Sequence, residues 1–253
     1  MNNNAKTHFS ENKTAYTAGI VALVILLIIS IGYAAGYRFN NFVIGKVGHL
    51  KMEMPLPLTS VFVDDSEEAV TSADNQALNI TLSPGEHTVI VSKLGYFPWT
   101  KDISIPSNGD VTISPLFITQ NTSGQIITTK DKEYASLKFK ILTDKLPTKL
   151  LPRLSNDKTA SLWIENNAIM LKVGDNISKI VQPDTVVRNV DFYKNRSDVV
   201  VFATQNGVYA IESGDPGTQN FMPIYKGQKP TFIKADANSL YILDVATLMQ
   251  VII

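Results

Sequence analysis

The sequence predicts a mainly β protein: one N-terminal transmembrane helix, a small antiparallel β-sandwich, and then a β-meander arranged as a partial β-propeller. Three observations lead to this fold class. Residues 15–37 carry no charge, which is typical of a membrane span. Short runs with strand character, separated by turn signals, fill residues 60–117. An apolar pattern then recurs every 39 residues between positions 161 and 249.

The composition is that of folded domains and excludes some kinds of partner. The 253 residues are 44% hydrophobic and 18% charged, which favours packed cores over disorder. Lys plus Arg and Asp plus Glu both number 23, so we expect no basic surface for nucleic acid. The chain has no cysteine, which excludes disulfides, zinc–thiolate sites and a cysteine nucleophile without fixing the compartment.

Residues 15–37 are long enough to cross a bilayer. A helix of this length covers about 34 Å at 1.5 Å per residue, more than the hydrocarbon core requires. Lys6 and Lys13 precede the segment and Arg38 follows it. The alternatives are a buried core helix and a cleaved signal peptide, but the flanking basic residues favour a membrane span, and the apolar run at 19–32 is long for a signal sequence. We therefore expect an uncleaved anchor.

The span leaves its orientation and its association open. The tail before it holds two basic residues and the stretch just after it holds three, so the positive-inside rule does not decide the orientation. Gly32 and Gly36 form a G-x-x-x-G pattern, which would let two helices approach closely as a homodimer. Small residues are also common in spanning helices for no such reason.

A first β module is expected after a juxtamembrane linker at residues 38–55, whose exit is stiffened by Pro55 and Pro57. The acidic turn at residues 63–68 is one of several turn signals that separate the predicted strands. These strands are expected at residues 60–64, 77–82, 87–93, 99–105 and 110–117.

The stretch LSPGEHTVIVSKLGYFPWT contains the most distinctive turns of this module. Pro84 predicts a tight reversal in which Gly85 takes positive φ, and residues 88–91 then enter a strand expected to be buried on both faces. Gly95 permits a bend. Three aromatic side chains follow and are expected to fill the core: Tyr96, Phe97 and Trp99.

At these residues the chain resembles the PEGA domain family, over about residues 56–118. The family's repeats follow their first strand with Asp-Gly, whereas here Asp65 stands in the glycine place. The resemblance implies an extracytoplasmic, non-catalytic β module of prokaryotic envelope proteins, and so favours a cytoplasmic N-terminus and an exported body. It also marks the structural motif: Gly85, His87, Gly95, Tyr96, Pro98 and Trp99.

The second half of the chain contains an internal repeat. Three segments align without gaps: residues 161–171, 200–210 and 239–249. One aromatic position recurs in all three: Trp163, Phe202 and Tyr241. Asn167 and Asn206 also coincide, as Asn at a hairpin turn would require. A period near 40 residues built from paired strands is typical of propeller blades.

Residues 124–253 hold only about three such periods, fewer than the four blades of the smallest usual ring. We therefore expect a ring that does not close, with an exposed strand edge at residues 251–253 unless something covers it. An open arrangement, a truncated chain and completion by a second copy all remain open. Residues 212–232 also resemble the linking stretch of propeller-like regions that follow PEGA domains in some bacterial membrane-anchored proteins.

The sequence offers no catalytic constellation. His8, His49 and His87 lie far apart in the chain without metal-ligand spacing, and His87 is interpreted as a structural turn residue. Residues 64–68 could gather oxygen ligands for calcium, but they lack the D-x-D-x-D-G pattern. Phosphate-binding loops and nucleophile elbows are missing as well. We expect no catalytic residue, no metal and no cofactor.

These inferences predict a single-pass, membrane-anchored extracytoplasmic protein of the cell envelope that binds or scaffolds an envelope protein or a glycan and is not an enzyme. A transmembrane signalling or assembly subunit dimerising through its helix is the alternative, and a glycan-acting enzyme, which would need a carboxylate pair in a cleft, is a third. The predicted domains are the tail 1–14, the transmembrane helix 15–37, the linker 38–55, the PEGA-like domain 56–118 and the propeller-like region 119–253.

Overall fold

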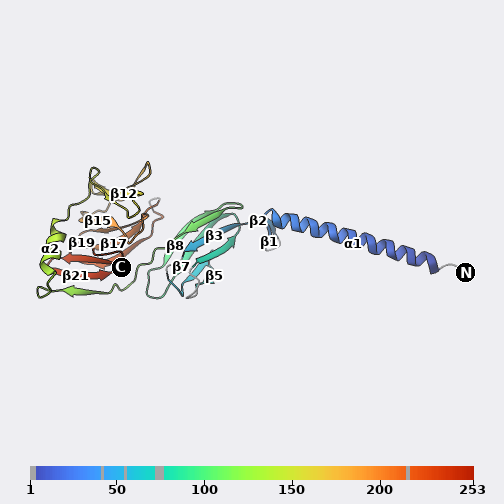
Figure 1. Cartoon of the computed structure of the whole chain (residues 1–253), viewed down its shortest axis with the longest axis horizontal. Helices are drawn as coiled ribbons and strands as arrows, with labels where there is room; N and C mark the ends of the chain where they lie inside the picture. The colour runs from blue at the N-terminus through green and yellow to red at the C-terminus, as the bar shows by residue number, and fades with distance from the viewer. Residues whose placement is uncertain (1–3, 41–42, 54–55, 72–76, 215–216) are drawn as a thin grey trace. The chain divides into compact units, whose positions relative to one another are not determined.

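The structure is a computed structural model that describes residues 4–40, 43–53, 56–71, 77–214 and 217–253 (Figure 1). It divides into two compact units, and each is described here by itself. The first unit comprises Met1–Glu53, Ala77–His87 and Ile103–Ile113; the second comprises Met54–Gln76, Thr88–Asp102 and Ser114–Ile253. Over the described residues taken together strands far outweigh helices, which confirms the predicted mainly β class.

The first unit begins with the predicted apolar helix. Helix α1 (Asn4–Ala34) is continuous and contains the span Ala15–Ala34, which has a mean hydropathy of 2.5 and no buried residue (Figure 1). The helix ends before Gly36, which has φ +85° and donates its N–H to the Tyr33 carbonyl at 3.1 Å. This is the usual place of a glycine just beyond a helix end. Gly32 thus lies on α1 and Gly36 lies beyond its end, while the expected dimer contact through these two residues stays a prediction.

The residues expected as a linker are instead built into strands. Strands β1 (Tyr37–Asn40) and β2 (Val43–Lys46) form a hairpin, and β3 (Gly48–Glu53) is the central strand of a sheet in which Leu50 and Met52 are fully buried. The linker prediction for residues 38–55 is wrong there. The polar and apolar residues of β3 alternate because one face of this strand is buried and the other is exposed.

This sheet of the first unit has the order β6-β3-β9. Strand β6 (Ala77–Leu82) pairs antiparallel with β3, whereas β9 (Asp110–Ile113) pairs parallel with it. Lys51 on β3 forms an ion pair of 2.5 Å with Asp110 on β9. The parallel pair differs from the wholly antiparallel module that was predicted, because hydrophobic alternation does not report the direction of a partner strand.

Another sheet, which belongs mostly to the second unit, has the order β5-β4-β7-β8. Its strands are β4 (Ser60–Val63), β5 (Ser66–Val70), β7 (Gly85–Ser92) and β8 (Trp99–Ile105). Gly85 at φ +133° and Gly95 at φ +84° have the positive φ that their turns were expected to need. Along β7, Val89 and Val91 are buried but Thr88 is exposed, so the expected burial of both faces is wrong.

The turn between β4 and β5 consists of Asp64 at φ +49° and Asp65 at φ +67°. Two central residues with positive φ are characteristic of the type I′ hairpin turn. The strand resumes at Ser66, so the acidic turn is shorter than predicted. An Asp64 carboxylate oxygen accepts the Thr88 N–H at 3.0 Å, which holds the turn against β7.

The rest of the second unit consists of three four-stranded antiparallel sheets. They are, in spatial order, β11 (Arg153–Leu154), β12 (Ala160–Glu165), β13 (Ala168–Val173) and β14 (Asn176–Val181); β15 (Asn189–Phe192), β16 (Val199–Ala203), β17 (Gly207–Glu212) and β18 (Phe221–Lys226); and β19 (Pro230–Lys234), β20 (Ser239–Asp244), β21 (Thr247–Ile252) and β10 (Gly124–Ile127). The repeated aromatics lie on the second strand of each sheet, as the 39-residue repeat predicts: Trp163, Phe202 and Tyr241.

The third sheet takes its last strand from the start of this region. Strand β10 pairs antiparallel with β21, so the edge that was expected at residues 251–253 is covered. A Cβ on Gly124 would lie 2.3 Å from the Gln250 carbonyl oxygen. Only glycine therefore allows the two strands to approach this closely.

Two apolar cores hold the sheets. One packs residues of the first two sheets together and includes Leu162, Ile169, Val190 and Phe202. The other lies under α2 (Tyr134–Thr143), a helix that we did not predict, whose Leu137 and Ile141 pack on the third sheet. The helical signal was a spacing of i, i+3 and i+7, from Tyr134 through Leu137 to Ile141, in a segment of only ten residues.

We predict that Asp65→Gly stabilises the second unit by about 0.5–1 kcal/mol, because glycine accepts left-handed backbone without the cost that a Cβ imposes. Asp64→Gly is the matched control and should bring no such gain, because it also removes the acceptor of the Thr88 N–H. Urea unfolding midpoints of the detergent-solubilised chain measure both changes. Equal gains in the two variants would contradict this account of the turn.

Candidate functional site

The motif tryptophan lies at a buried polar junction. Trp99 is 1% exposed, and its indole N–H donates to a carboxylate oxygen of Glu212, itself 3% exposed, at 2.7 Å. Asn220 donates to the other oxygen at 3.0 Å. Lys101 and Arg196 approach the same carboxylate at 3.6 and 3.9 Å. Burial of a carboxylate is costly without such partners, and these four groups supply them.

The same junction joins the backbone of β8 to the second of the three repeat sheets. The side-chain oxygen of Asn220 accepts the Thr100 N–H at 3.2 Å, and the side-chain nitrogen of Asn220 donates to the Thr100 carbonyl at 2.9 Å. The side chain thus pairs with the β8 backbone as a neighbouring strand would. Arg196 donates to the Ser114 and Pro115 carbonyls at 2.8 and 3.0 Å. We call Trp99, Lys101, Arg196, Glu212 and Asn220 the Trp99 joint. It fixes the motif-bearing sheet against the repeat sheets within the second unit.

The other motif residues lie in separate local roles. The His87 Nε2–H donates to the Ser83 carbonyl at 2.8 Å, which fits the structural role expected for His87. Tyr96 is half-buried and meets Phe117 edge to face at 6.0 Å, while Pro98 is exposed. A Cβ at Gly85 or Gly95 would meet nothing, so these glycines serve the backbone. The motif as a whole therefore does not form one site.

A charged network lies on the first strands of the three repeat sheets. Arg153 on β11 pairs with Asp144, and the Asn189 amide on β15 donates to Asp144 at 3.0 Å and to the Phe232 carbonyl of β19 at 2.5 Å. Asp191 lies on β15 as well, and burial raises its pKa against the opposing pull of Lys234 and Arg153. Two carboxylates and two cations balance in this network, so it ties the three sheets together with little net charge.

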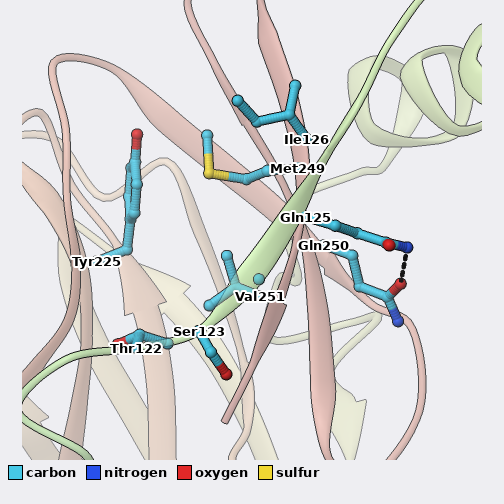
Figure 2. A pocket seen from close by; sticks show the side chains of 9 residues that line it. Thr122, Ser123, Gln125, Ile126, Tyr225, Met249, Gln250 and Val251 are labelled. Carbon is cyan, nitrogen blue, oxygen red and sulfur yellow. Dashed lines mark hydrogen bonds between the residues drawn. The ribbon is translucent and has the colours of Figure 1, made fainter.

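A small cavity opens beside β10 (Figure 2). Its volume is about 170 Å³, and side chains from β10, β21 and Tyr225 surround it in Figure 2. The lining residues are Thr122, Ser123, Gly124, Gln125, Ile126, Tyr225, Met249, Gln250 and Val251. Ligand pockets for small molecules usually have roughly 300–1,000 Å³, so this cavity has the size for one side chain of a partner.

Tyr225 forms a fixed wall of this cavity. Its hydroxyl donates to an Asp244 carboxylate oxygen at 3.0 Å, and burial together with that carboxylate raises the Tyr225 pKa to about 12. Asp244 is held in turn by the backbone N–H groups of Gln228 and Lys229, at 3.1 and 2.8 Å. The tyrosine is therefore held in one orientation and stays protonated at neutral pH.

The free edge of β10 adjoins the cavity. Ser123 accepts the Ile252 N–H at 2.9 Å, so by antiparallel alternation Ser123 and Gln125 face β21 while the N–H and C=O of Gly124 and Ile126 point away from it. β10 is the last strand of its sheet. An unpaired edge next to a side-chain-sized cavity can accept an extended peptide as an added strand. We call β10 and this cavity the edge groove.

Among the residues that the structure describes, no three His, Asp, Glu or Cys side chains are grouped as a metal site would require. The acidic turn at 64–68 thus shows a backbone role, through Asp64 and Thr88, in the part of the chain described. Sequence reasoning missed both the Trp99 joint and the edge groove, because each depends on residues that are more than a hundred positions apart in the chain.

We predict that Trp99→Phe lowers the free energy of unfolding by about 2 kcal/mol more than Trp163→Phe does. The first change leaves a buried Glu212 oxygen without its donor. Trp163 is equally buried, but its N–H lies 3.5 Å from an exposed Glu165 carboxylate, too far for a normal hydrogen bond. Urea unfolding midpoints, followed by circular dichroism, give the comparison. Equal losses of unfolding free energy in the two variants would contradict the proposed importance of the joint.

Comparisons with known proteins do not place the chain in a family. No protein-family model matches it, and no curated protein matches it. One similar solved structure is the crystal structure of a putative phosphatase from Bacteroides thetaiotaomicron, with 13% sequence identity and a TM-score of 0.24. The match covers 74% of this chain and 49% of that chain, so it spans about half of the other protein. Similarity at this level bears on neither fold nor chemistry.

Proposed function

We propose that the protein is a single-pass, membrane-anchored binding or scaffolding protein whose β-built body is displayed outside the cytoplasm. One observation carries this proposal: α1 contains an apolar span, Ala15–Ala34, of which nothing is buried in the rest of the chain. A helix that is apolar all round and uncovered by protein is stable in lipid and unfavourable in water.

Membership of the PEGA family is part of the same proposal. It is supported by the stretch at residues 84–100 and by the positive φ of Gly85 and Gly95 at the motif's turns. An envelope location, an exported body and a non-catalytic role come with that membership. They agree with a site built from a strand edge and a fixed tyrosine.

The body is suited to hold a partner at a defined position. The hydrogen bonds of the Trp99 joint connect the motif-bearing sheet to the repeat sheets. A partner bound to a repeat sheet is therefore also held in position relative to the motif-bearing sheet. The edge groove is the recognition surface that we propose. Its chemistry favours an extended segment of an envelope protein over a glycan, because the free β10 backbone offers strand pairing.

A signalling or assembly subunit that dimerises through α1 has less support. Gly36 lies beyond the helix end, and only Gly32 of the predicted pair is helical. A Cβ on Gly32 would meet nothing within the chain, so the position tolerates larger residues unless a second helix packs there. We therefore retain binding and scaffolding as the function.

We predict that the mature chain stays in the membrane fraction after alkaline carbonate washing and leaves it only with detergent, because α1 remains in the hydrocarbon. Mass spectrometry of the purified chain should find the residues of Ala15–Ala34 still attached. A soluble body that starts beyond Ala34 would instead identify α1 as a cleaved signal sequence. Protease access from outside the cytoplasm, compared before and after lysis, tests the orientation.

We predict that Ile126→Pro abolishes partner capture by the displayed body, while Ile126→Val preserves it. Proline removes an N–H that faces the free edge and leaves the β10–β21 bonds intact, whereas valine keeps that N–H. Crosslinking of membranes that carry each variant, after equal urea midpoints have been verified, gives the readout. Capture that is indifferent to Ile126→Pro would exclude the edge groove as the recognition surface.

A further inference from the structure

Large apolar side chains are exposed along the outer side of α2 and the loop that follows it. Their exposed fractions run from 44% to 91%, in a segment that ends at β11. Monomeric soluble domains rarely expose so many large apolar groups in one stretch without a partner. The six residues are Phe139, Leu142, Leu146, Leu150, Leu151 and Leu154.

On α2, these side chains are distinct from the buried side of the helix. Leu137 and Ile141 face the third sheet, whereas Phe139 and Leu142, three positions apart, lie together on the far side of the helix. Phe139 is 67% exposed and Leu142 is 64% exposed. The helix therefore has a second apolar stripe that its own core does not use.

The loop after α2 presents Leu150 at the tip of a tight turn. Thr148 and Leu151 exchange two backbone hydrogen bonds, at 3.1 and 3.0 Å, so Lys149 and Leu150 occupy the two central turn positions. Leu150 is 91% exposed there. The Ile164 N–H holds the base of the loop by donating to the Pro147 carbonyl at 3.0 Å. These backbone hydrogen bonds thus keep Leu150 in solvent, although burial of its side chain would be favourable.

Lysines alternate with the apolar residues in this segment: Lys138, Lys140, Lys145 and Lys149. The one acid between positions 138 and 154, Asp144, is paired with Arg153. The whole chain has no net charge, so this local excess of positive charge is not a general property of the surface. We call the six apolar residues and the four lysines the leucine–lysine face.

We propose that the leucine–lysine face docks on an anionic lipid surface, with Leu150 and its neighbours inserted at the level of the headgroups. Apolar insertion surrounded by lysines is the chemistry that binds such membranes. A protein partner is less suited, because lysine is depleted from the cores of protein interfaces. Two copies meeting through this face about a two-fold axis would bring their lysines together. The proposal goes beyond anchoring by α1 and does not depend on its orientation.

The chain has no cysteine, so one introduced cysteine can carry a single environment-sensitive dye. We expect the dye on Leu150→Cys, in the full chain reconstituted in vesicles, to shift to the blue and to be quenched by nitroxide lipids when phosphatidylglycerol is present. Vesicles of phosphatidylcholine alone should give neither change. Salt at about 1 M, where the Debye length is about 3 Å, should reverse the change.

Two labelled positions serve as references. Leu94→Cys lies at a 99% exposed position of the β7–β8 loop and should remain aqueous in every vesicle. Ile20→Cys lies in α1 and reports insertion of that helix in both vesicle types. A Leu150 dye that stays aqueous in anionic vesicles, while the Ile20 dye is buried, overturns the docking proposal without touching the anchor.

Replacement of the three exposed lysines Lys140, Lys145 and Lys149 by glutamine should lower the ratio of docked to undocked chain on the order of a hundredfold, at about fivefold for each lysine. The matched control replaces three exposed lysines elsewhere, Lys179, Lys226 and Lys229, and should leave docking unchanged.

Three further outcomes would contradict the proposal. Equal protection of the Leu150 dye in neutral and anionic vesicles would show that charge does not direct the contact. Protection that disappears when the protein is diluted in lipid would assign the face to a second copy. Protection that is found in native membranes but not in pure anionic vesicles would assign it to a protein partner.

Discussion

The buried carboxylate of Glu212 is the constraint on which the arrangement of the second unit depends. It lies between the motif tryptophan of β8 and the repeat sheets, and it needs every donor around it because water does not reach it. An apolar contact would have tolerated sliding between the two sheets. A carboxylate with one indole N–H, one amide and two cations has few satisfactory positions, so the polar groups specify the docking geometry that hydrophobic burial alone leaves loose.

The edge strands of the three repeat sheets are also held by specific partners. Each sheet presents its first strand to a shared network of charges and amides, and the third borrows β10 so that β21 is paired on both sides. The free edge is thereby moved from β21 to β10, where Gly124 allows close pairing and the cavity lies alongside. The proposed recognition surface, the edge groove, is thus the unpaired edge of the third sheet.

Local patterns predicted most of the fold, and long-range partnership was where they failed. Charge absence in residues 15–37 and the 39-residue repeat predicted α1 and the meander, because both depend on spacing within one segment. Strand β3 was missed because its alternation was short and followed a glycine-bearing hairpin. Neither the parallel direction of β9 nor the Trp99–Glu212 bond leaves a local trace. The candidate site was therefore invisible in the sequence, although Gly124 is an unusual residue for a strand.

The pairing of β10 with the third sheet also determines when that sheet can fold during synthesis. Strand β10 leaves the ribosome more than a hundred residues before β21, its partner across the ladder. Until then β10 lacks its partner in the sheet, and the core under α2 lacks Leu248. Pairing at such sequence separation is slow, because the ends of a long loop must meet before any contact rewards them. A nascent chain therefore carries an unpaired β10 until β21 has been synthesised, and chaperones that bind extended segments would find β10 during that interval.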